Sequence, residues 1–223
     1  MGQVERRTFI KLALATTALL SGIELVKGKE ITRKASEAKE EKLWGLVIDL
    51  RKCVRCGRCV TACKEKNKLP EHVFFNKMMK VKISGREYEL PASCMHCRRP
   101  PCMYVCPTGA TYRREDGIVL VDYDICIGCR YCAAACPYLA RVPNEEELPL
   151  FPKGVVIKCN FCVDLIDAGK VPACVAACPY GARIFGNLKD PTSEVFHALE
   201  SSESVVVLKP ELGTWPTWYY ILG

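Results

Sequence analysis

Cysteine is the residue type through which this chain could do chemistry. The 223-residue sequence contains 16 cysteines, and all of them fall into four groups of four. Every group opens with two cysteines separated by two residues and closes with two separated by three, so the chain carries a fourfold internal repeat. The groups are Cys53, Cys56, Cys59 and Cys63; Cys94, Cys97, Cys102 and Cys106; Cys126, Cys129, Cys132 and Cys136; and Cys159, Cys162, Cys174 and Cys178.

This spacing can bring thiolates around a small inorganic core. Cysteines three residues apart require a tight loop, which Gly57 and Gly128 favour because glycine accepts backbone conformations that other residues resist. The last cysteine of a group follows about one helical turn after the third. We therefore expect it on the helix that leaves the loop, where it points away from the first core. In two-cluster ferredoxins the corresponding cysteine ligates the neighbouring [4Fe–4S] cluster.

The residue after the last cysteine also belongs to the repeat. It is proline at positions 107, 137 and 179, and the first group departs from this pattern with Lys64. Proline limits continuation of a helix and has no N–H group to offer.

Two other uses of cysteine compete with an iron–sulfur site. Sixteen cysteines could form eight disulfide bonds, but such a framework gives no reason for four near-identical groups. Zinc also uses four-cysteine sites, usually with two cysteines from each of two knuckles. Zinc does not require a triple run followed by Cys-Pro, so the spacings favour iron–sulfur clusters.

The charge of the chain agrees with such clusters. The formal net charge of +7 treats cysteine as neutral, whereas an oxidised [4Fe–4S] core with four thiolates carries about −2. Because no aromatic side chains alternate with the basic ones, we expect no nucleic-acid partner. Basic residues crowd the cysteine groups and are expected to offset the cluster charge: Arg51, Lys52, Arg55, Arg58, Arg98, Arg99 and Arg130.

The first 26 residues resemble an export signal. Arg6 and Arg7 precede an uncharged apolar run, Leu12–Ile23, as in a twin-arginine signal. This run is shorter than the roughly 20 apolar residues of a transmembrane helix. We expect residues 1–26 to act as the signal and to direct the protein to the extracytoplasmic (periplasmic or equivalent) face of the cytoplasmic membrane.

The segment around the signal leaves cleavage open. Glu5 stands where such signals usually have a small hydroxyl residue, and no Ala-x-Ala sequence follows the apolar run. Residues 27–42 are almost entirely polar and are expected to form a solvated linker.

Short strands are predicted between the cysteine groups. Residues 79–83 and 86–90 alternate around a Ser-Gly turn and predict a hairpin, and residues 110–113 and 118–121 predict another. Two further strands are expected at 43–50 and 155–157, with a loop at 145–152. The pattern predicts short helices and hairpins wrapped around metal, with the clusters replacing much of the core.

Several motifs together identify a family. They are the Cys-Pro-x-x-Ala endings at Cys106, Cys136 and Cys178, the stretch CMHCRRPPC at 94–102, and the tail GTWPTWYY at 213–220. With the four cysteine groups and the twin-arginine head, residues 43–223 resemble the iron–sulfur electron-transfer subunit of membrane-associated molybdopterin oxidoreductases. The resemblance is to the dimethyl sulfoxide, polysulfide and tetrathionate reductase type and the formate-dependent nitrite reduction type.

The resemblance implies an α+β fold of two interlocked ferredoxin-like units, each with two [4Fe–4S] clusters. Residues 43–93 and 145–223 would form one unit from the first and fourth groups, and residues 94–144 an inserted unit from the second and third. The implied ligands are Cys53, Cys56, Cys59 and Cys178 for cluster 1; Cys63, Cys159, Cys162 and Cys174 for cluster 2; Cys94, Cys97, Cys102 and Cys136 for cluster 3; and Cys106, Cys126, Cys129 and Cys132 for cluster 4.

The implied function is the relay of single electrons between a large molybdopterin (or tungstopterin) catalytic subunit and an integral membrane quinone-reactive subunit. The chain has no nucleotide-binding motif and no constellation of catalytic residues, so no catalytic centre of its own is expected. Two alternatives stay open: a relay in an exported hydrogenase or formate dehydrogenase, and an exported disulfide- or zinc-bound module without redox function.

Two further features of the sequence each allow two interpretations. His96, inside a Cys-x-x-Cys sequence, could donate a hydrogen bond to a cluster sulfur, or be an ordinary loop histidine. The closing aromatic residues, Trp215 and 218–220, could dock on a partner or pack on the protein's own sheet.

Overall fold

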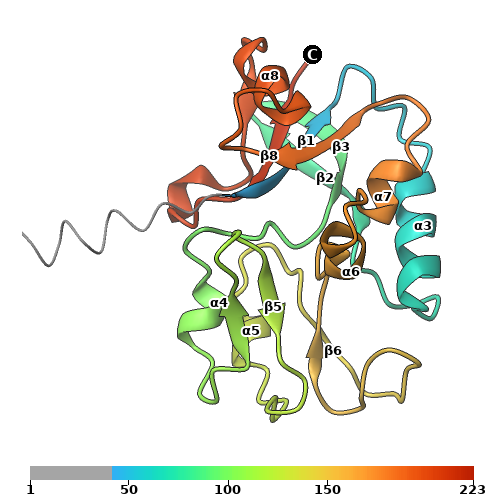
Figure 1. Cartoon of the computed structure of the whole chain (residues 1–223), viewed down its shortest axis with the longest axis vertical. Helices are drawn as coiled ribbons and strands as arrows, with labels where there is room; N and C mark the ends of the chain where they lie inside the picture. The colour runs from blue at the N-terminus through green and yellow to red at the C-terminus, as the bar shows by residue number, and fades with distance from the viewer. Residues whose placement is uncertain (1–41) are drawn as a thin grey trace, which may run out of the picture. The chain divides into compact units, whose positions relative to one another are not determined.

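The computed structural model describes residues 42–223, in which short strands and helices alternate with the cysteine loops (Figure 1). The predicted signal and all but the last residue of the predicted linker lie outside these residues. No helix in the described part of the chain has the length and apolar character needed to span a bilayer. The helices are α3 (Arg58–Asn67), α4 (Pro101–Tyr104), α5 (Tyr131–Ala134), α6 (Val163–Asp167), α7 (Ala173–Ala176), α8 (Glu194–Glu200) and the 3-10 turn η1 (Pro210–Leu212).

A four-stranded sheet holds the two ends of the described chain together. Its order is β8-β1-β10-β9, formed by β1 (Trp44–Asp49), β8 (Arg183–Asn187), β9 (Val205–Val206) and β10 (Trp218–Ile221). The first and last strands, β1 and β10, pair in parallel, with Leu46 opposite Trp218. Because both strands alternate apolar residues into the interior, Leu46, Ile48, Trp218 and Tyr220 are almost fully buried in the main core.

The remaining strands form two-stranded ribbons, and both predicted hairpins are confirmed. The ribbons pair β2 (Lys77–Ile83) with β3 (Arg86–Ala92), β4 (Thr111–Arg113) with β5 (Val119–Val121), and β6 (Val142–Pro143) with β7 (Val156–Ile157). The predicted strands at 43–50 and 155–157 correspond to β1 and β7. The predicted loop at 145–152 contains a single bridge between Leu148 and Phe151.

The prediction that each last cysteine lies on a helix is correct only for the first group. Cys63 lies within α3, which is ten residues long. The helices α4, α5 and α7 are single turns that end two residues before Cys106, Cys136 and Cys178. The following proline explains the difference, because it disfavours helical backbone at the residue before it. The first group has lysine at this position, so its helix continues.

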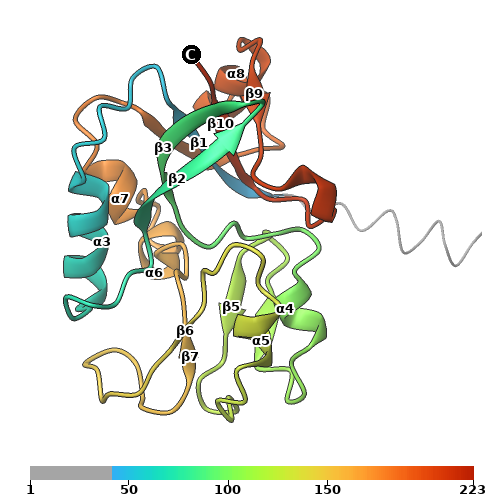
Figure 2. The ribbon, with the colours of Figure 1, turned by 180° about the vertical axis from the view of Figure 1, so that it is seen from behind.

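The helices that follow the cysteine loops pack in two pairs. Helix α3 lies against α7, and α4 lies against α5, as Figures 1 and 2 show from opposite sides. The fold therefore brings the first cysteine group to the fourth, and the second to the third.

Gly128 occupies a position where a side chain has no room. Its φ of +66° is left-handed, and an added Cβ would lie 1.9 Å from the carbonyl oxygen of Gly154. Gly85, in the β2–β3 turn, has a similar φ of +84° but open space around it. The loop of the third cysteine group is thus in direct backbone contact with the turn between β6 and β7.

We expect Gly128→Ala to destabilise the protein more than Gly85→Ala. Both changes introduce left-handed strain of about 1–2 kcal/mol, and only Gly128→Ala adds a steric clash with the backbone. The test compares the apparent temperature at which the two variants lose their visible absorption under anaerobic conditions. If this temperature falls equally in the two variants, the backbone contact between Gly128 and Gly154 is contradicted.

Candidate metal centres

The same backbone turn recurs in all four Cys-x-x-Cys sequences. The residue directly before the second cysteine is left-handed in each group, with φ between 40° and 66° at Arg55, His96, Gly128 and Phe161. Three of these are not glycine, and left-handed backbone costs such residues about 1–3 kcal/mol, so it persists only where the surroundings impose it. The fourfold sequence repeat is therefore also a repeat of local structure.

Three cavities lie between the cysteine groups, and each has four cysteines in its lining. Counting the part open to solvent, their volumes are about 370, 330 and 310 Å³. Each cavity combines three cysteines of one group with one cysteine of another. Set 1 is Cys53, Cys56, Cys59 and Cys178; set 2 is Cys63, Cys159, Cys162 and Cys174; set 4 is Cys106, Cys126, Cys129 and Cys132.

The four remaining cysteines also lie close to one another. We call Cys94, Cys97, Cys102 and Cys136 set 3. Burial raises the pKa of the Cys97 thiol to about 12, and the negative charges of the other three members add to this effect. The structure therefore brings together the cysteines of every predicted ligand set, and none of the 16 forms a disulfide bond within the described residues.

The four sets follow one another in a row. The charge on Cys174 in set 2 raises the pKa of Cys59 in set 1, after the larger effect of burial. Likewise, Cys94 in set 3 raises the pKa of Cys159 in set 2. Arg141 lies close to both set 3 and set 4. Burial lowers the pKa of its guanidinium, but thiolates of both sets raise it, and the net effect is a raised pKa. Contacts agree with these neighbours, since Arg183 lines the cavity of set 1 and donates to Cys174 of set 2. Cys94 of set 3 packs in the same core cluster as Cys159 of set 2, and Cys102 of set 3 packs with Cys132 of set 4. The order is therefore set 1, set 2, set 3, set 4.

Burial differs along this row. Cys56 in set 1 and Cys129 in set 4 are exposed, whereas three of the four cysteines in each inner set are buried. Burial raises the pKa of a thiol because it disfavours the charged form, as for Cys159, whose pKa rises to about 12. Ligating thiolates at the inner sets therefore require positive charge nearby.

Three buried cations supply this charge. Arg141, Lys158 and Arg183 are at most 6% exposed. Arg141 Nη2 donates to Cys102 Sγ at 3.0 Å, and Arg183 Nη2 donates to Cys174 Sγ at 3.4 Å. Lys158 Nζ donates to the carbonyl oxygens of Cys159, at 2.7 Å, and Val119. Burial lowers the pKa of Lys158, and the thiolate of Cys94 opposes that effect.

Sequence analysis missed these three residues. The seven basic residues that it named are all exposed, so water screens their effect on the clusters. A signal for two of the buried cations was present, since Cys136 and Cys178 each begin a Cys-Pro-Tyr-x-Ala-Arg sequence. The third, Lys158, carries no such pattern.

Some buried N–H groups beside the sets are positioned to donate hydrogen bonds to the inorganic sulfide of a cluster. Nε and Nη1 of Arg183 and Nε1 of Trp218 are buried and have no hydrogen-bond partner among residues 42–223. Trp218 also lines the cavity of set 2. Buried N–H groups normally have acceptors, and the sulfur atoms of a [4Fe–4S] cluster can accept hydrogen bonds. Four thiolates with unpaired donors beside them therefore match the requirements of such a cluster.

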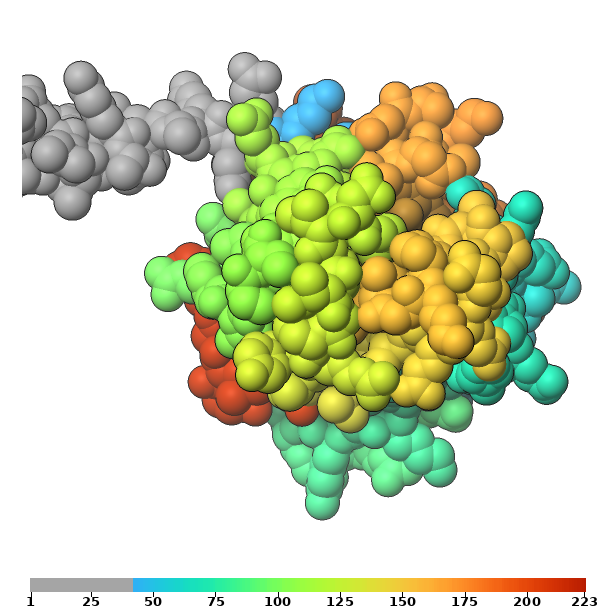
Figure 3. Space-filling view, turned by 90° about the horizontal axis from the view of Figure 1, so that it is seen from below, coloured from blue at the N-terminus to red at the C-terminus, as the bar shows by residue number. Residues whose placement is uncertain are grey.

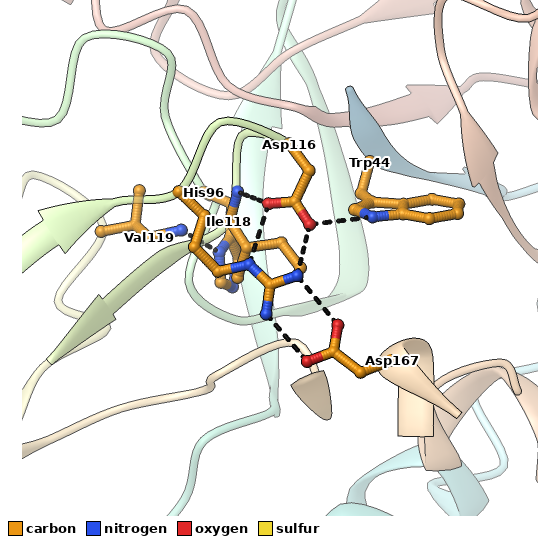
Figure 4. A network of polar contacts seen from close by, with 7 residues as sticks. Trp44, His96, Asp116, Ile118, Val119 and Asp167 are labelled. Carbon is orange, nitrogen blue, oxygen red and sulfur yellow. Dashed lines mark hydrogen bonds and ion pairs between the residues drawn. The ribbon is translucent and has the colours of Figure 1, made fainter. Parts of the chain in front are cut away.

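His96 is a buried residue of the core rather than an ordinary loop histidine. Its Nδ1 accepts the backbone N–H of Val119 at 3.1 Å (Figure 4). Its ring stacks on Phe161, with 4.5 Å between the ring centres. Because Nδ1 accepts, the neutral ring carries its proton on Nε2, which has no partner within residues 42–223. Burial lowers the pKa of His96 well below its ordinary value, and Lys158 adds to this effect. The predicted hydrogen bond to a cluster sulfur stays a prediction.

The closing aromatic residues differ in burial, and the predicted docking on a partner stays a prediction. Trp218 and Tyr220 pack in the protein's own sheet, as one interpretation held. Trp215 is 47% exposed and lies beside the guanidinium groups of Arg98 and Arg99, 5.5 and 3.9 Å from its ring centre.

Arg114 and Asp116, in the turn of the β4–β5 hairpin, connect this hairpin to α6 and β1. Figure 4 shows Asp116 beside Trp44. The guanidinium of Arg114 bonds both carboxylate oxygens of Asp116 in the same turn and both of Asp167 in α6. Asp116 also accepts Trp44 Nε1 of β1 at 3.2 Å. The network therefore holds the segment between the second and third cysteine groups against β1 and α6.

Taken together, the fold and the four sets define an iron–sulfur protein of the ferredoxin type. Two family models, both described as 4Fe-4S dicluster domains, match residues 52–110 and 86–188. The sequence is 38% identical to a tetrathionate reductase subunit of Salmonella typhimurium, over 97% of this chain and 87% of the relative. It is 44% identical to a sulfite dehydrogenase subunit of Allochromatium vinosum, over 79% and 81%. A polysulfide reductase polypeptide of Wolinella succinogenes is 38% identical, over 81% and 94%.

The protein belongs to the family of iron–sulfur electron-transfer subunits of molybdenum oxidoreductases. Its cofactors are four [4Fe–4S] clusters, and its function is electron relay in anaerobic respiration. When bound, each cluster supplies one-electron chemistry. The protein supplies the thiolate ligands, the buried cations and the exclusion of water from the inner sets.

We expect the two carboxylates that bind Arg114 to differ in their contribution to stability. Asp116 is 14% exposed and accepts four hydrogen bonds, so Asp116→Ala should cost about 1–3 kcal/mol. Asp167 is 52% exposed and binds only Arg114 in the described structure, so Asp167→Ala should cost about 1 kcal/mol or less. Thermal or denaturant unfolding of the anaerobic protein measures both, and an equal or reversed order would contradict the assigned role of Asp116.

Proposed function

We propose that each of the four cysteine sets ligates one [4Fe–4S] cluster, so that three cysteines of one group act with the last cysteine of its partner group. The observation that carries this proposal is the composition of the cavities, in which Cys178, Cys63 and Cys106 join cysteines from another group. Set 3 follows the same rule through Cys136.

The same crossing supports a division into two interlocked ferredoxin-like units. Residues 43–93 and 145–223 form the outer unit with sets 1 and 2, and residues 94–144 form the inserted unit with sets 3 and 4. The pairing of α3 with α7 and of α4 with α5 supports this division. Arg114 and His96 would then be contacts between the units, because their partners Asp167 and Phe161 belong to the outer unit.

Electrons would pass along the row of clusters and enter or leave at its two ends. The exposure of Cys56 and Cys129 supports this assignment, since only the outer sets have exposed ligands. Exposed apolar residues lie directly beside both, Val54 at set 1 and Ile127 and Tyr131 at set 4. Apolar and aromatic side chains are typical of the centre of protein interfaces.

The two partners would be a large molybdopterin catalytic subunit and an integral membrane quinone-reactive subunit. The names of the relatives support a multisubunit assembly, because they denote single subunits of a tetrathionate reductase and of a sulfite dehydrogenase. One name denotes reduction and the other oxidation, so the catalytic partner would decide the direction of electron flow. An exported hydrogenase or formate dehydrogenase is the alternative assembly, and the identity of co-purifying subunits distinguishes it.

The assembly would lie at the extracytoplasmic face of the cytoplasmic membrane. Arg6 and Arg7 before a short apolar run support export by the twin-arginine route.

The crossed ligand sets predict which cluster each serine variant damages. Cys136→Ser should alter the cluster of set 3, the same one that Cys97→Ser alters, because it removes one of its four thiolates. Cys106→Ser should alter the cluster of set 4, the same one that Cys129→Ser alters. Paramagnetic resonance during an anaerobic redox titration identifies the altered signal in each variant.

Iron content provides the control for this experiment. Each variant loses one ligand, so its iron should fall by far less than half, with some loss of yield because ligation also stabilises the fold. If Cys136→Ser instead alters the signal that Cys129→Ser alters, the cysteines of one group share a cluster and the crossed sets are wrong.

Export predicts a change of compartment when both arginines are replaced. Arg6→Lys with Arg7→Lys should leave cluster-loaded protein in the cytoplasm, because the twin-arginine machinery reads the arginine pair. Cell fractionation with an iron assay of each fraction measures the distribution. Normal delivery of the double variant, in a strain without the partner subunits, would exclude a signal at these residues.

A further inference from the structure

The two Cys-Pro-Tyr-x-Ala-Arg sequences end in buried arginines at matching places. Arg141 lies five residues after Cys136, and Arg183 lies five residues after Cys178. The other two groups have no arginine at this position: the residue five positions after Cys106 is Thr111, and the residue five positions after Cys63 is Lys68. Each proposed unit therefore contains one arginine of this kind, from one of its two cysteine groups.

Each guanidinium lies between two cysteine sets. Arg141 Nη2 donates to Cys102 Sγ in set 3 at 3.0 Å, and its Nη1 donates to Thr111, which lines the cavity of set 4. Arg183 Nη2 donates to Cys174 Sγ in set 2 at 3.4 Å, and Arg183 also lines the cavity of set 1. Each arginine therefore contacts a cysteine of one set in its pair and borders the other set.

Within residues 42–223, neither arginine has a carboxylate partner, because no ion pair found there includes Arg141 or Arg183. The potentially anionic group that each one contacts is a cysteine sulfur, Cys102 for Arg141 and Cys174 for Arg183. Arg141 Nη1 donates to the hydroxyl of Thr111 at 3.0 Å, and the guanidinium of Arg183 lies 5.2 Å from the ring centre of Trp218. These contacts are neutral. A buried cation without a counter-ion costs several kcal/mol, so the compensating negative charge has to come from the cysteine sets.

The unpaired donors of Arg183 point to the same conclusion. Its Nη2 donates to Cys174, while Nε and Nη1 have no partner in the described chain although they are buried. A guanidinium has five N–H donors and never loses its charge in a protein. Such a group beside two clusters can donate hydrogen bonds to cluster sulfur and keep the same charge at every pH.

We propose that Arg141 and Arg183 are the internal counter-ions of the two cluster pairs, and that each raises the reduction potential of both clusters that it separates. The proposal rests on the ligand sets of the proposed function. An electron that enters a pair adds one negative charge beside the guanidinium and leaves for the next pair, with no proton involved. The fixed positive charge stabilises the reduced state, and its effect is large because the surroundings are dry. Charge and hydrogen bonds to sulfur are the features through which a protein sets such potentials.

The experiment replaces each arginine in the full-length chain and measures the midpoint potential of all four clusters. Arg141→Leu should lower the equilibrium constant for reduction of the clusters in sets 3 and 4 by about tenfold or more. For a one-electron couple, a tenfold change lowers the midpoint potential by about 59 mV. Sets 1 and 2 should keep their potentials. Arg183→Leu should do the reverse. The readout is an anaerobic redox titration followed by paramagnetic resonance, with signals assigned by the cysteine variants above.

Exposed arginines beside the outer sets provide matched controls. Arg130→Leu at set 4 and Arg55→Leu at set 1 also remove one positive charge next to a cysteine. Arg130 is 58% exposed, and water screens it, so its removal should shift the potential less than removal of Arg141. Arg141→Lys and Arg183→Lys keep the charge and should shift the potential less than the leucine variants.

The outcomes separate this inference from the proposed function. Shifts confined to the arginine's own pair and larger than the control shifts support it. Potential shifts no larger than those of the control variants, or shifts in the other pair, overturn the inference. If the variant still contains four intact clusters, such a result does not contradict the proposed ligand sets. If a leucine variant fails to assemble its clusters, Arg141→Gln or Arg183→Gln decides, because glutamine removes the charge and keeps an N–H donor. The potentials of its own pair must fall, and unchanged potentials or a change in the other pair overturn the proposal.

Discussion

The negative charge that four clusters place inside a small protein is the constraint on which the rest of this structure depends. Sixteen thiolates and their inorganic cores lie within a single compact unit, and at the inner sets most of the ligands are buried. Burying a charge is costly unless an opposite charge or hydrogen bonds compensate for it. Arg141, Lys158 and Arg183 meet this need from inside the core, where the exposed basic residues cannot. The three cations lie along the row of sets, with Lys158 between the second and third.

The topology satisfies this constraint with very little regular structure. Apart from α3 the helices are one or two turns long, and most strands pair in ribbons of two. The one larger sheet joins β1 to β10, so the beginning and the end of the described chain close around the cysteine loops. The face in Figure 3 shows residues of the second and third groups beside the β6–β7 region. Metal ligation then contributes much of the stability that a larger apolar core supplies elsewhere.

The gradient of burial along the row agrees with electron relay. The inner sets exclude water, which strengthens the electrostatic influence of the buried cations on them. The outer sets each expose one cysteine, so a partner can approach a cluster closely at either end. The exposed Ile127 and Tyr131 flank Cys129, whereas the equivalent loop at set 1 exposes Val54 and the charged Arg55. The two ends thus present different surfaces, which agrees with the proposed binding of a different partner at each end.

The sequence by itself determined the chemistry of this protein, because ligation depends on residue type and short-range spacing. The four cysteine groups, the two hairpins and the left-handed loop at Gly128 are local features, and periodicity and spacing were sufficient to predict them. Only the tertiary structure decided which basic residues face the clusters, because the exposed Arg55 and the buried Arg183 differ in environment and not in type. The environment of His96 was also decided by the tertiary structure, because its ring stacks on Phe161, which lies far from it in the sequence. Burial and the dielectric environment that it creates arise from long-range packing, which a local pattern of residues does not specify.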